Sequence, residues 1–196
     1  MPNNSLRASG RIGKACFKTS KPAGGPNPNP PWRRWLLKQV DRWAIEQIRD
    51  NTVFRTAEHL AWFGLLDRTR REPPPSNTIE EVGFLHLYKL TDDYRAKPVR
   101  VSGTVHEVRY VPAPKNRFNI DSYYILWLKV DNGPNTPLVA YTLSLPEGFP
   151  RPERGDMKAV REAVTFTGYF FKRWAYQAHD GSRVAPLMLI HTPDWE

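Results

Sequence analysis

The stretch from Val99 to Tyr110 constrains the fold of this chain more than any other feature. Apolar or small residues occupy every second position up to Val105, which places them on one face of a β-strand. The alternation then resumes out of phase at Val108. A shift of this kind after a glycine inside a strand, here Gly103, indicates a β-bulge. A bulge lets one long strand bend between the two halves of a barrel.

The C-terminal half contains four further stretches that are typical of strands. Turn-forming residues separate them, with Asp-Asn-Gly-Pro at 131–134 and His-Asp-Gly-Ser at 179–182. The first of the four stretches is apolar on both faces. The expected strands are 123–130, 138–145, 164–176 and 184–191.

A short helix is expected between the third and fourth strands, because Met157, Val160 and Ala163 recur at intervals of three. Five strands, the first long and bulged, with a helix before the fourth, match the plan of an OB-fold. The expected fold class is therefore mainly β (α+β), with a five-stranded OB-like Greek-key barrel. The same run of strands also fits an unrelated small barrel or sandwich.

Two amphipathic helices are expected before the strands. Apolar residues between Trp32 and Trp43 recur at spacings of four and three, which indicates a helix over 32–50, and a second helix is expected over 55–69. Short helices with one apolar side typically pack that side against another part of the folded protein. The alternative is that residues 32–69 dock a protein partner or a second copy of the chain.

A proline-rich linker of polyproline type follows at 73–77. Thr78 and Glu81 have the spacing of a capping box, which opens a short helical or extended segment toward Leu90. These features divide the chain into a leader at 1–31, a helical segment at 32–72 and an OB-like domain at 73–196.

The basic charge of the chain lies in its N-terminal part. The net charge is +9, and residues 1–40 hold eight Lys or Arg residues and no acidic residue, so the remainder is almost neutral. The proline and glycine content predicts a disordered leader over 1–31. Such a leader is a solvated tail, an arm for nucleic acid or anionic lipid, or a targeting peptide. No transmembrane segment or signal peptide is visible, so a cytoplasmic location is the default expectation.

No constellation of catalytic or metal-ligating residues is found in the sequence. The five histidines have no HxH or HxxxH spacing, and the single cysteine lies in the leader. A nucleophile elbow and a phosphate-binding loop are both missing. We therefore expect no catalytic residue, no metal site and no cofactor.

The densest aromatic and basic cluster lies at 169–176. On a regular strand its odd-numbered and even-numbered side chains lie on opposite faces. Aromatic residues interleaved with cations bind single-stranded nucleic acid, with base stacking that contributes roughly 1–3 kcal/mol per base. In a second interpretation one face fills the core and the other packs under helices, and a third makes the cluster a protein-docking patch. The candidate binding face comprises Tyr169, Phe171, Lys172, Arg173, Trp174, Tyr176, Trp127, Tyr123, Arg109 and Lys115.

Two stretches resemble known bacterial proteins. The run from Asp93 to Val105 resembles the opening of bacterial OB-fold domains, which usually have glycine where this chain has Ala96. The stretch at 164–176, followed by APLML at 185–189, resembles an OB-fold-like family of hypothetical proteins from planctomycete-type bacteria with GYFFKxxxY and APLML-like motifs. This resemblance covers roughly residues 55–196. The resemblance implies the fold but no reaction. Longer relatives often have membrane segments elsewhere in their chains, which implies membrane association for those relatives.

These observations together lead to one expected function and one alternative. We expect a non-catalytic, OB-fold-like binding or scaffold module that contacts protein. The alternative is single-stranded nucleic-acid binding through the strand at 169–176 and the basic leader.

Overall fold

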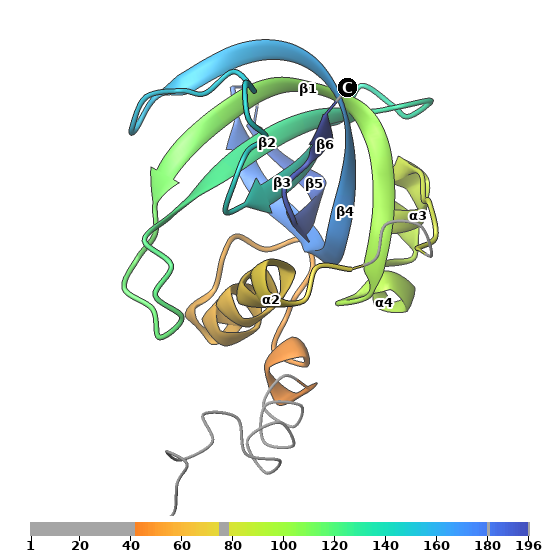
Figure 1. The fold of residues 1–196 in the computed structure, drawn as a ribbon. Coiled ribbons are helices and arrows are strands. Elements are labelled where there is room, and N and C mark those ends of the chain that lie inside the picture. The colour runs from red at the N-terminus through yellow and green to blue at the C-terminus, as the bar shows by residue number, and fades with distance from the viewer. Residues whose placement is uncertain (1–41, 75–78, 180, 196) are drawn as a thin grey trace, which may run out of the picture.

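The predicted strands close into a ring. The structure is a computed structural model that describes residues 42–74, 79–179 and 181–195. In it β1 (Pro98–Pro112) pairs with β2 (Ser122–Val130) on one edge and with β4 (Met157–Ala178) on the other. β2 pairs with β3 (Leu138–Thr142), which lies parallel to β5 (Gly181–Ile190), and β5 returns antiparallel to β4. The ring order is therefore β1-β2-β3-β5-β4, closed by the β1–β4 pairing (Figure 1).

The expectation of a mainly β fold with five strands, the first of them long, is confirmed, and so is the bulge in β1. The register of β1 shifts between Val105 and Glu107 against both of its neighbours, so one insertion bends β1 around the ring. A short additional strand, β6 (Asp194–Trp195), pairs with β4.

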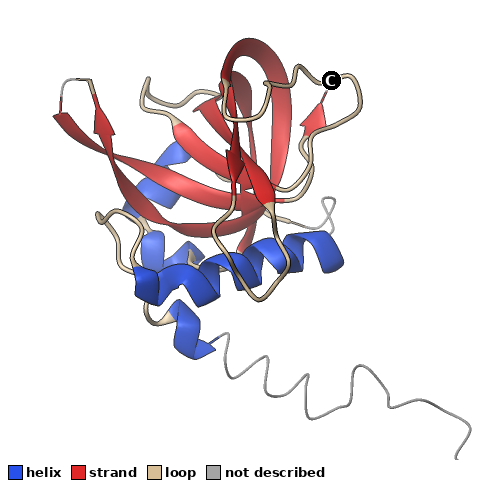
Figure 2. Ribbon diagram, turned by 90° about the vertical axis from the view of Figure 1, so that its left-hand side faces the viewer, coloured by secondary structure: helices blue, strands red, loops and turns tan. Residues whose placement is uncertain are grey.

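Helices cover one side of the ring (Figure 2). A 3-10 turn, η1 (Thr56–Glu58), continues into α2 (His59–Arg71), which contacts β4 and β5 and confirms the helix expected at 55–69. α3 (Phe84–Lys89) and α4 (Thr91–Tyr94) precede β1. Of the helix expected at 32–50, the described part is helical only at 42–45. Residues 32–41, the leader at 1–31 and the capping residue Thr78 lie outside the described residues.

The apolar side chains form two separate cores, one inside the ring and one outside it. The inner core contains Leu126 and Leu128 of β2, and α3 closes one end of it with Leu87. The outer core lies between α2 and the outer face of the sheet, and Ile125 and Trp127 of β2 belong to it. The prediction that the second strand is apolar on both faces is confirmed, because a core lies on each side of it.

The helix expected at 157–163 is wrong. β4 begins at Met157, and its first residues pair with β1 from Arg109 back to Thr104. The bent β1 offers a long edge there, and its ladder hydrogen bonds outweigh a weak local spacing of three. The third strand also ends earlier than expected, at Thr142, whose hydroxyl donates to the backbone carbonyls of Ser144 and His191.

The turn that enters β1 has an unusual backbone conformation. Ala96 has a φ of 55°, in the left-handed region that glycine adopts without strain. Its N–H donates to the carbonyl of Phe170, which fixes the turn against β4. Glycine would adopt this conformation at a lower cost, so the sequence accepts some backbone strain at Ala96.

Candidate binding surface

A second β-bulge determines which side chains of β4 face outward. Phe170 lies opposite Met188, but Lys172 lies opposite Leu187, so Phe171 is the extra residue. Phe171 and Trp174 consequently pack in the same outer core, although strict alternation places them on opposite faces. The expected division of 169–176 into odd and even faces is therefore wrong, because the bulge changes the phase of the strand.

The first part of this cluster is covered by α2. Tyr169 and Phe171 are both buried in the outer core. The Trp62 ring of α2 meets Phe171 edge-on, with the ring centroids 5.3 Å apart, and meets Tyr141 in the same way at 4.4 Å. The guanidinium of Arg68 lies over the Tyr169 ring at 5.9 Å. These contacts stabilise the attachment of α2 and leave no face of Tyr169 or Phe171 open for a ligand.

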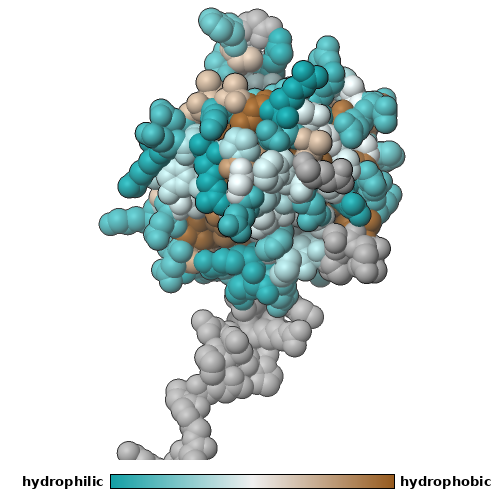
Figure 3. All heavy atoms as spheres, turned by 45° about the horizontal axis from the view of Figure 1, so that its top comes forward, coloured by the Kyte–Doolittle hydropathy of each residue, from teal (hydrophilic) through white to brown (hydrophobic). Residues whose placement is uncertain are grey.

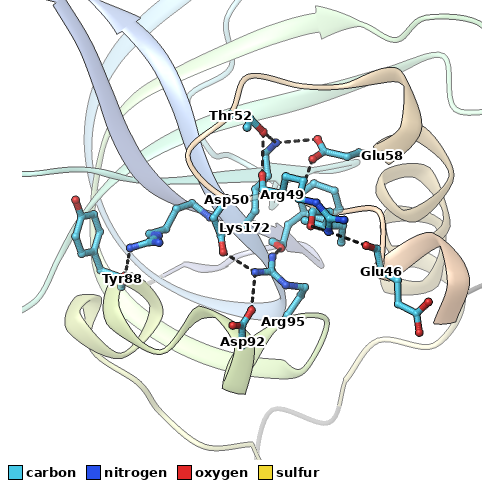
Figure 4. Close-up of polar contacts among 12 residues, drawn as sticks. Glu46, Arg49, Asp50, Thr52, Glu58, Tyr88, Asp92, Arg95 and Lys172 are labelled. Atoms are coloured by element: carbon cyan, nitrogen blue, oxygen red, sulfur yellow. Dashed lines mark hydrogen bonds and ion pairs between the residues drawn. The ribbon is translucent and has the colours of Figure 1, made fainter.

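Lys172 is fully buried and lies in an ion pair instead of at the surface (Figure 4). Its ammonium nitrogen donates to the Glu58 carboxylate at 2.7 Å and to the Thr52 hydroxyl and the Val53 carbonyl, each at 3.0 Å. These three acceptors use all of the hydrogens that an ammonium group carries. Burial lowers the pKa of Lys172, and Glu58 opposes that shift. With neither side chain exposed to solvent, the pair acts as a structural clamp.

A second ion pair holds the same part of β4. Arg95 Nη2 lies 2.6 Å from Asp50 Oδ2, and its other terminal nitrogen donates to the Phe171 carbonyl at 3.0 Å (Figure 4). Asp50 Oδ1 accepts the backbone N–H of Arg173 at 2.8 Å. Both pairs attach the segment at 49–58 to the β4 bulge, and we call Glu58–Lys172 and Asp50–Arg95 the ionic clamp. The Arg173 side chain points elsewhere and donates to the Tyr88 carbonyl.

The Asp50 carboxylate makes stability depend on pH. Burial alone raises its pKa, but the hydrogen bonds from Arg95 and the Arg173 amide, with the Arg95 charge, outweigh burial and lower the pKa below 3.8. The contribution of Asp50 to the free energy of unfolding is therefore complete above the pKa that it has in the unfolded chain. This contribution is lost as the pH falls through its lower pKa in the folded protein. We expect Asp50→Asn to be less stable by about 1–3 kcal/mol at pH 7. Urea unfolding at several pH values from 7 to 3 measures the free energy of unfolding of both proteins. The difference between them should become smaller in acid, and a difference that does not change with pH would contradict the clamp.

Three aromatic side chains farther along the outer face remain partly open to solvent. Trp174 and Tyr176 stack with an interplanar angle of 24° and centroids 5.4 Å apart, and Trp127 of β2 lies 5.1 Å from Tyr176. Val53 is 64% exposed, and both of its chain neighbours contact Trp174. We call Trp127, Trp174 and Tyr176 the aromatic strip. Figure 2 shows β4 and β5, whose hairpin carries two of these rings, projecting beyond the ring.

A groove separates the start of α2 from the β1–β2 loop. It consists of two adjoining pockets of about 190 Å³ and about 290 Å³ that share His59 and Phe63. We call it the aromatic groove. Its lining residues are Phe54, His59, Leu60, Trp62, Phe63, Pro114, Lys115, Asn116, Arg117, Phe118 and Tyr123. The part of the surface that faces away from α2 is mostly hydrophilic, with small separate hydrophobic spots (Figure 3).

The predicted binding residues therefore do not form one face. Seven of them are exposed or half-exposed: Tyr123 and Lys115 at the groove, Trp127, Trp174 and Tyr176 in the strip, Arg109, which donates to Glu107 on β1, and Arg173, which donates to the Tyr88 carbonyl. The other three, Tyr169, Phe171 and Lys172, are buried. Sequence reasoning missed the groove, although the run Lys-Asn-Arg-Phe at 115–118 carries the same mixture of basic and aromatic residues.

Neither the described residues nor a comparison with known proteins assigns a ligand or a function to these surfaces. Across the described ranges, no three His, Cys, Asp or Glu side chains lie close enough together to hold a metal ion. No helix in those ranges has the length and apolar character needed to cross a membrane. No protein-family model matches the chain, and no curated protein or solved structure matches it either.

Proposed function

We propose that this chain is a non-catalytic binding module of OB-like architecture whose aromatic strip contacts a protein partner. The architecture is supported by the ring order, in which five strands close through β1, and by the long bulged β1. OB-folds bind ligands on the face of their second and third strands and on the loops after the first and fourth. The strip and the groove lie in these regions. The segment between β3 and β4 contains no helix, which departs from the expected plan.

The partial exposure of three aromatic rings that contact one another is the observation that carries the protein-binding proposal. Tryptophan and tyrosine are enriched among residues that dominate protein interfaces, because they bury a large rigid area at a low entropic cost. The rings of the strip already contact one another, so little ordering is needed on binding. The region after residue 40 is almost neutral, which favours a protein over a polyanion at this strip.

A pair of matched substitutions tests this proposal. Val53→Asp places a charge between two residues that contact Trp174 of the strip, namely Thr52 and Phe54. Met157→Asp places a charge at a similarly open apolar site on β4, since the two side chains are 64% and 57% exposed. Light scattering on the full chain reports self-association, and pulldown from native extract followed by interferometry reports a retained partner. We expect Met157→Asp to keep the association and Val53→Asp to weaken it about tenfold or more, with equal melting temperatures. A monomer that retains no protein, or equal behaviour of the two variants, would overturn the proposal.

The alternative, nucleic-acid binding through the strand at 169–176, finds little support in that strand. Tyr169, Phe171 and Lys172 are buried, so they offer neither a stacking face nor a free charge. The basic leader lies outside the described residues.

A further inference from the structure

We propose that the aromatic groove binds a nucleobase together with its phosphate, supplied by a free nucleotide or by a single strand. This site lies on the β1–β2 loop and the start of α2, and it adjoins the strip at Phe54, which lines the inner pocket and contacts Trp174. Its test is independent of the protein-binding proposal because the variants change Lys115, Arg117 and Tyr123, which are not residues of the strip.

The inner pocket of the groove has aromatic walls. Phe54 meets Trp62 edge-on, with ring centroids 4.6 Å apart, and Trp62 meets Tyr123 in the same way at 6.3 Å. His59 lies edge-on to Phe63 at 6.2 Å on the side that opens to the outer pocket. The inner volume of about 190 Å³ is below the 300–1,000 Å³ typical of sites for drug-sized ligands. A pocket of this size and lining suits one planar ring, which can stack on or meet the surrounding rings.

A polar group also borders the inner pocket. The Tyr123 ring lines it, and no hydrogen bond of the phenol to another part of the described chain is present. A tyrosine phenol is protonated at neutral pH, and burial raises the pKa of this one further. A protonated hydroxyl can donate a hydrogen bond and can accept one, and the edge of a nucleobase carries both donors and acceptors. A purely hydrocarbon ligand has no donor and no acceptor.

The outer rim of the groove carries uncompensated positive charge. Lys115 and Arg117 are both exposed, and neither forms an ion pair with a described carboxylate. Neither pocket is lined by Asp or Glu. Arg117 lies over the Phe118 ring at 5.2 Å, which orients the guanidinium along the rim. Two free cations beside an aromatic pocket complement a phosphate attached to a ring, and this pairing of charge with stacking characterises single-strand recognition.

The loop that carries these cations is held in one shape. The Asn116 side-chain nitrogen donates to the carbonyls of Pro114 and Ile120, and its oxygen accepts the N–H groups of Phe118 and Ile120. One amide therefore ties both ends of the loop together, so binding requires little further ordering of the rim.

The test uses the full chain and a fluorescent dT12 oligonucleotide, followed by polarisation at 50 and 200 mM NaCl. Two phosphate contacts to a single strand predict that raising the salt between these limits weakens binding by about sevenfold. Lys115→Glu with Arg117→Glu should remove most of that affinity. A matched control, Lys158→Glu with Arg161→Glu, reverses two exposed cations at the start of β4 and should change affinity by no more than about twofold. Tyr123→Leu should weaken binding by about fivefold or more through lost stacking.

Competition distinguishes the source of the base. Displacement of dT12 by UMP or AMP would identify a nucleotide pocket, whereas displacement by unlabelled oligonucleotide alone would identify a single-strand site, and both outcomes support the proposal. Absence of binding at 50 mM NaCl would overturn it. Equal losses in the groove and control variants would also overturn it, because the binding would then be located elsewhere. Equal competition by polyglutamate or by phosphatidylglycerol vesicles would show recognition of charge without a base and contradict the proposal.

Discussion

Replacing Lys172 with methionine is expected to destabilise the protein by about 3–5 kcal/mol, which is the usual cost of removing one partner from a buried ion pair. The substitution leaves the Glu58 carboxylate fully buried without its cation, and it removes the donor to Thr52 and Val53. For a chain of this size, such a loss lowers the melting temperature by roughly 10 °C. Urea unfolding followed by tryptophan fluorescence and circular dichroism measures the free energy directly.

A double substitution separates the ion pair from simple loss of packing. Glu58→Gln removes the buried charge and keeps one acceptor oxygen, so it loses one of the two hydrogen bonds that the backbone N–H groups of Arg49 and Arg55 make to Oε1 and Oε2. Combined with Lys172→Met it should therefore recover much of the lost stability, so that the two effects are far from additive. A cost below about 1 kcal/mol for Lys172→Met alone would contradict the buried pair, since that is the value of an exposed one.

Gly168→Ala is expected to disrupt the closure of the ring. A Cβ atom at this position would lie 2.3 Å from the Leu189 carbonyl oxygen and 2.5 Å from the Ile190 Cα, and both are backbone atoms. β4 and β5 must separate to admit it, so we expect a loss at or above the upper end of the 1–3 kcal/mol that overpacking usually costs. Gly83→Ala is the matched control, because its added methyl meets only the His86 side chain at 3.8 Å. Melting temperatures compare the two variants, and equal values would contradict the close approach of β4 to β5.

Local sequence patterns predict the strands well where the pattern and the long-range pairing agree. In β1 the phase shift from Val105 to Val108 reports a bulge that is present against both neighbouring strands. At Met157 the two disagree, because a spacing of three suggested a helix while the far edge of β1 provides a ladder partner. No local signal identifies a partner that lies elsewhere in the chain.

The sequence predicted the types of residue in the candidate site but not how they are arranged. The aromatic and basic cluster at 169–176 is real, but the bulge at Phe171 redirects its side chains. Gly168 precedes this bulge as Gly103 precedes the bulge of β1, but the unbroken run of aromatic residues after Gly168 shows no change of phase. Lys172 pairs with Glu58, a residue 114 positions away, so its structural role was not visible in the sequence. The groove was missed because its walls come from three separate segments, namely Phe54, the start of α2 and the β1–β2 loop.

The outer face of the sheet has one part that α2 covers and another part that is open to solvent, and the aromatic strip lies in the open part. Hydroxyl-radical footprinting of the full chain, read by mass spectrometry at single residues, tests this division directly. We predict that Trp127, Trp174 and Tyr176 are oxidised faster than Trp62, Tyr141 and Phe171, which are at most 4% exposed. The exposed Trp43 provides an internal reference for full reactivity. Equal oxidation of the two sets, or faster oxidation of Trp62 and Phe171, would show that α2 does not cover the sheet and would contradict the account.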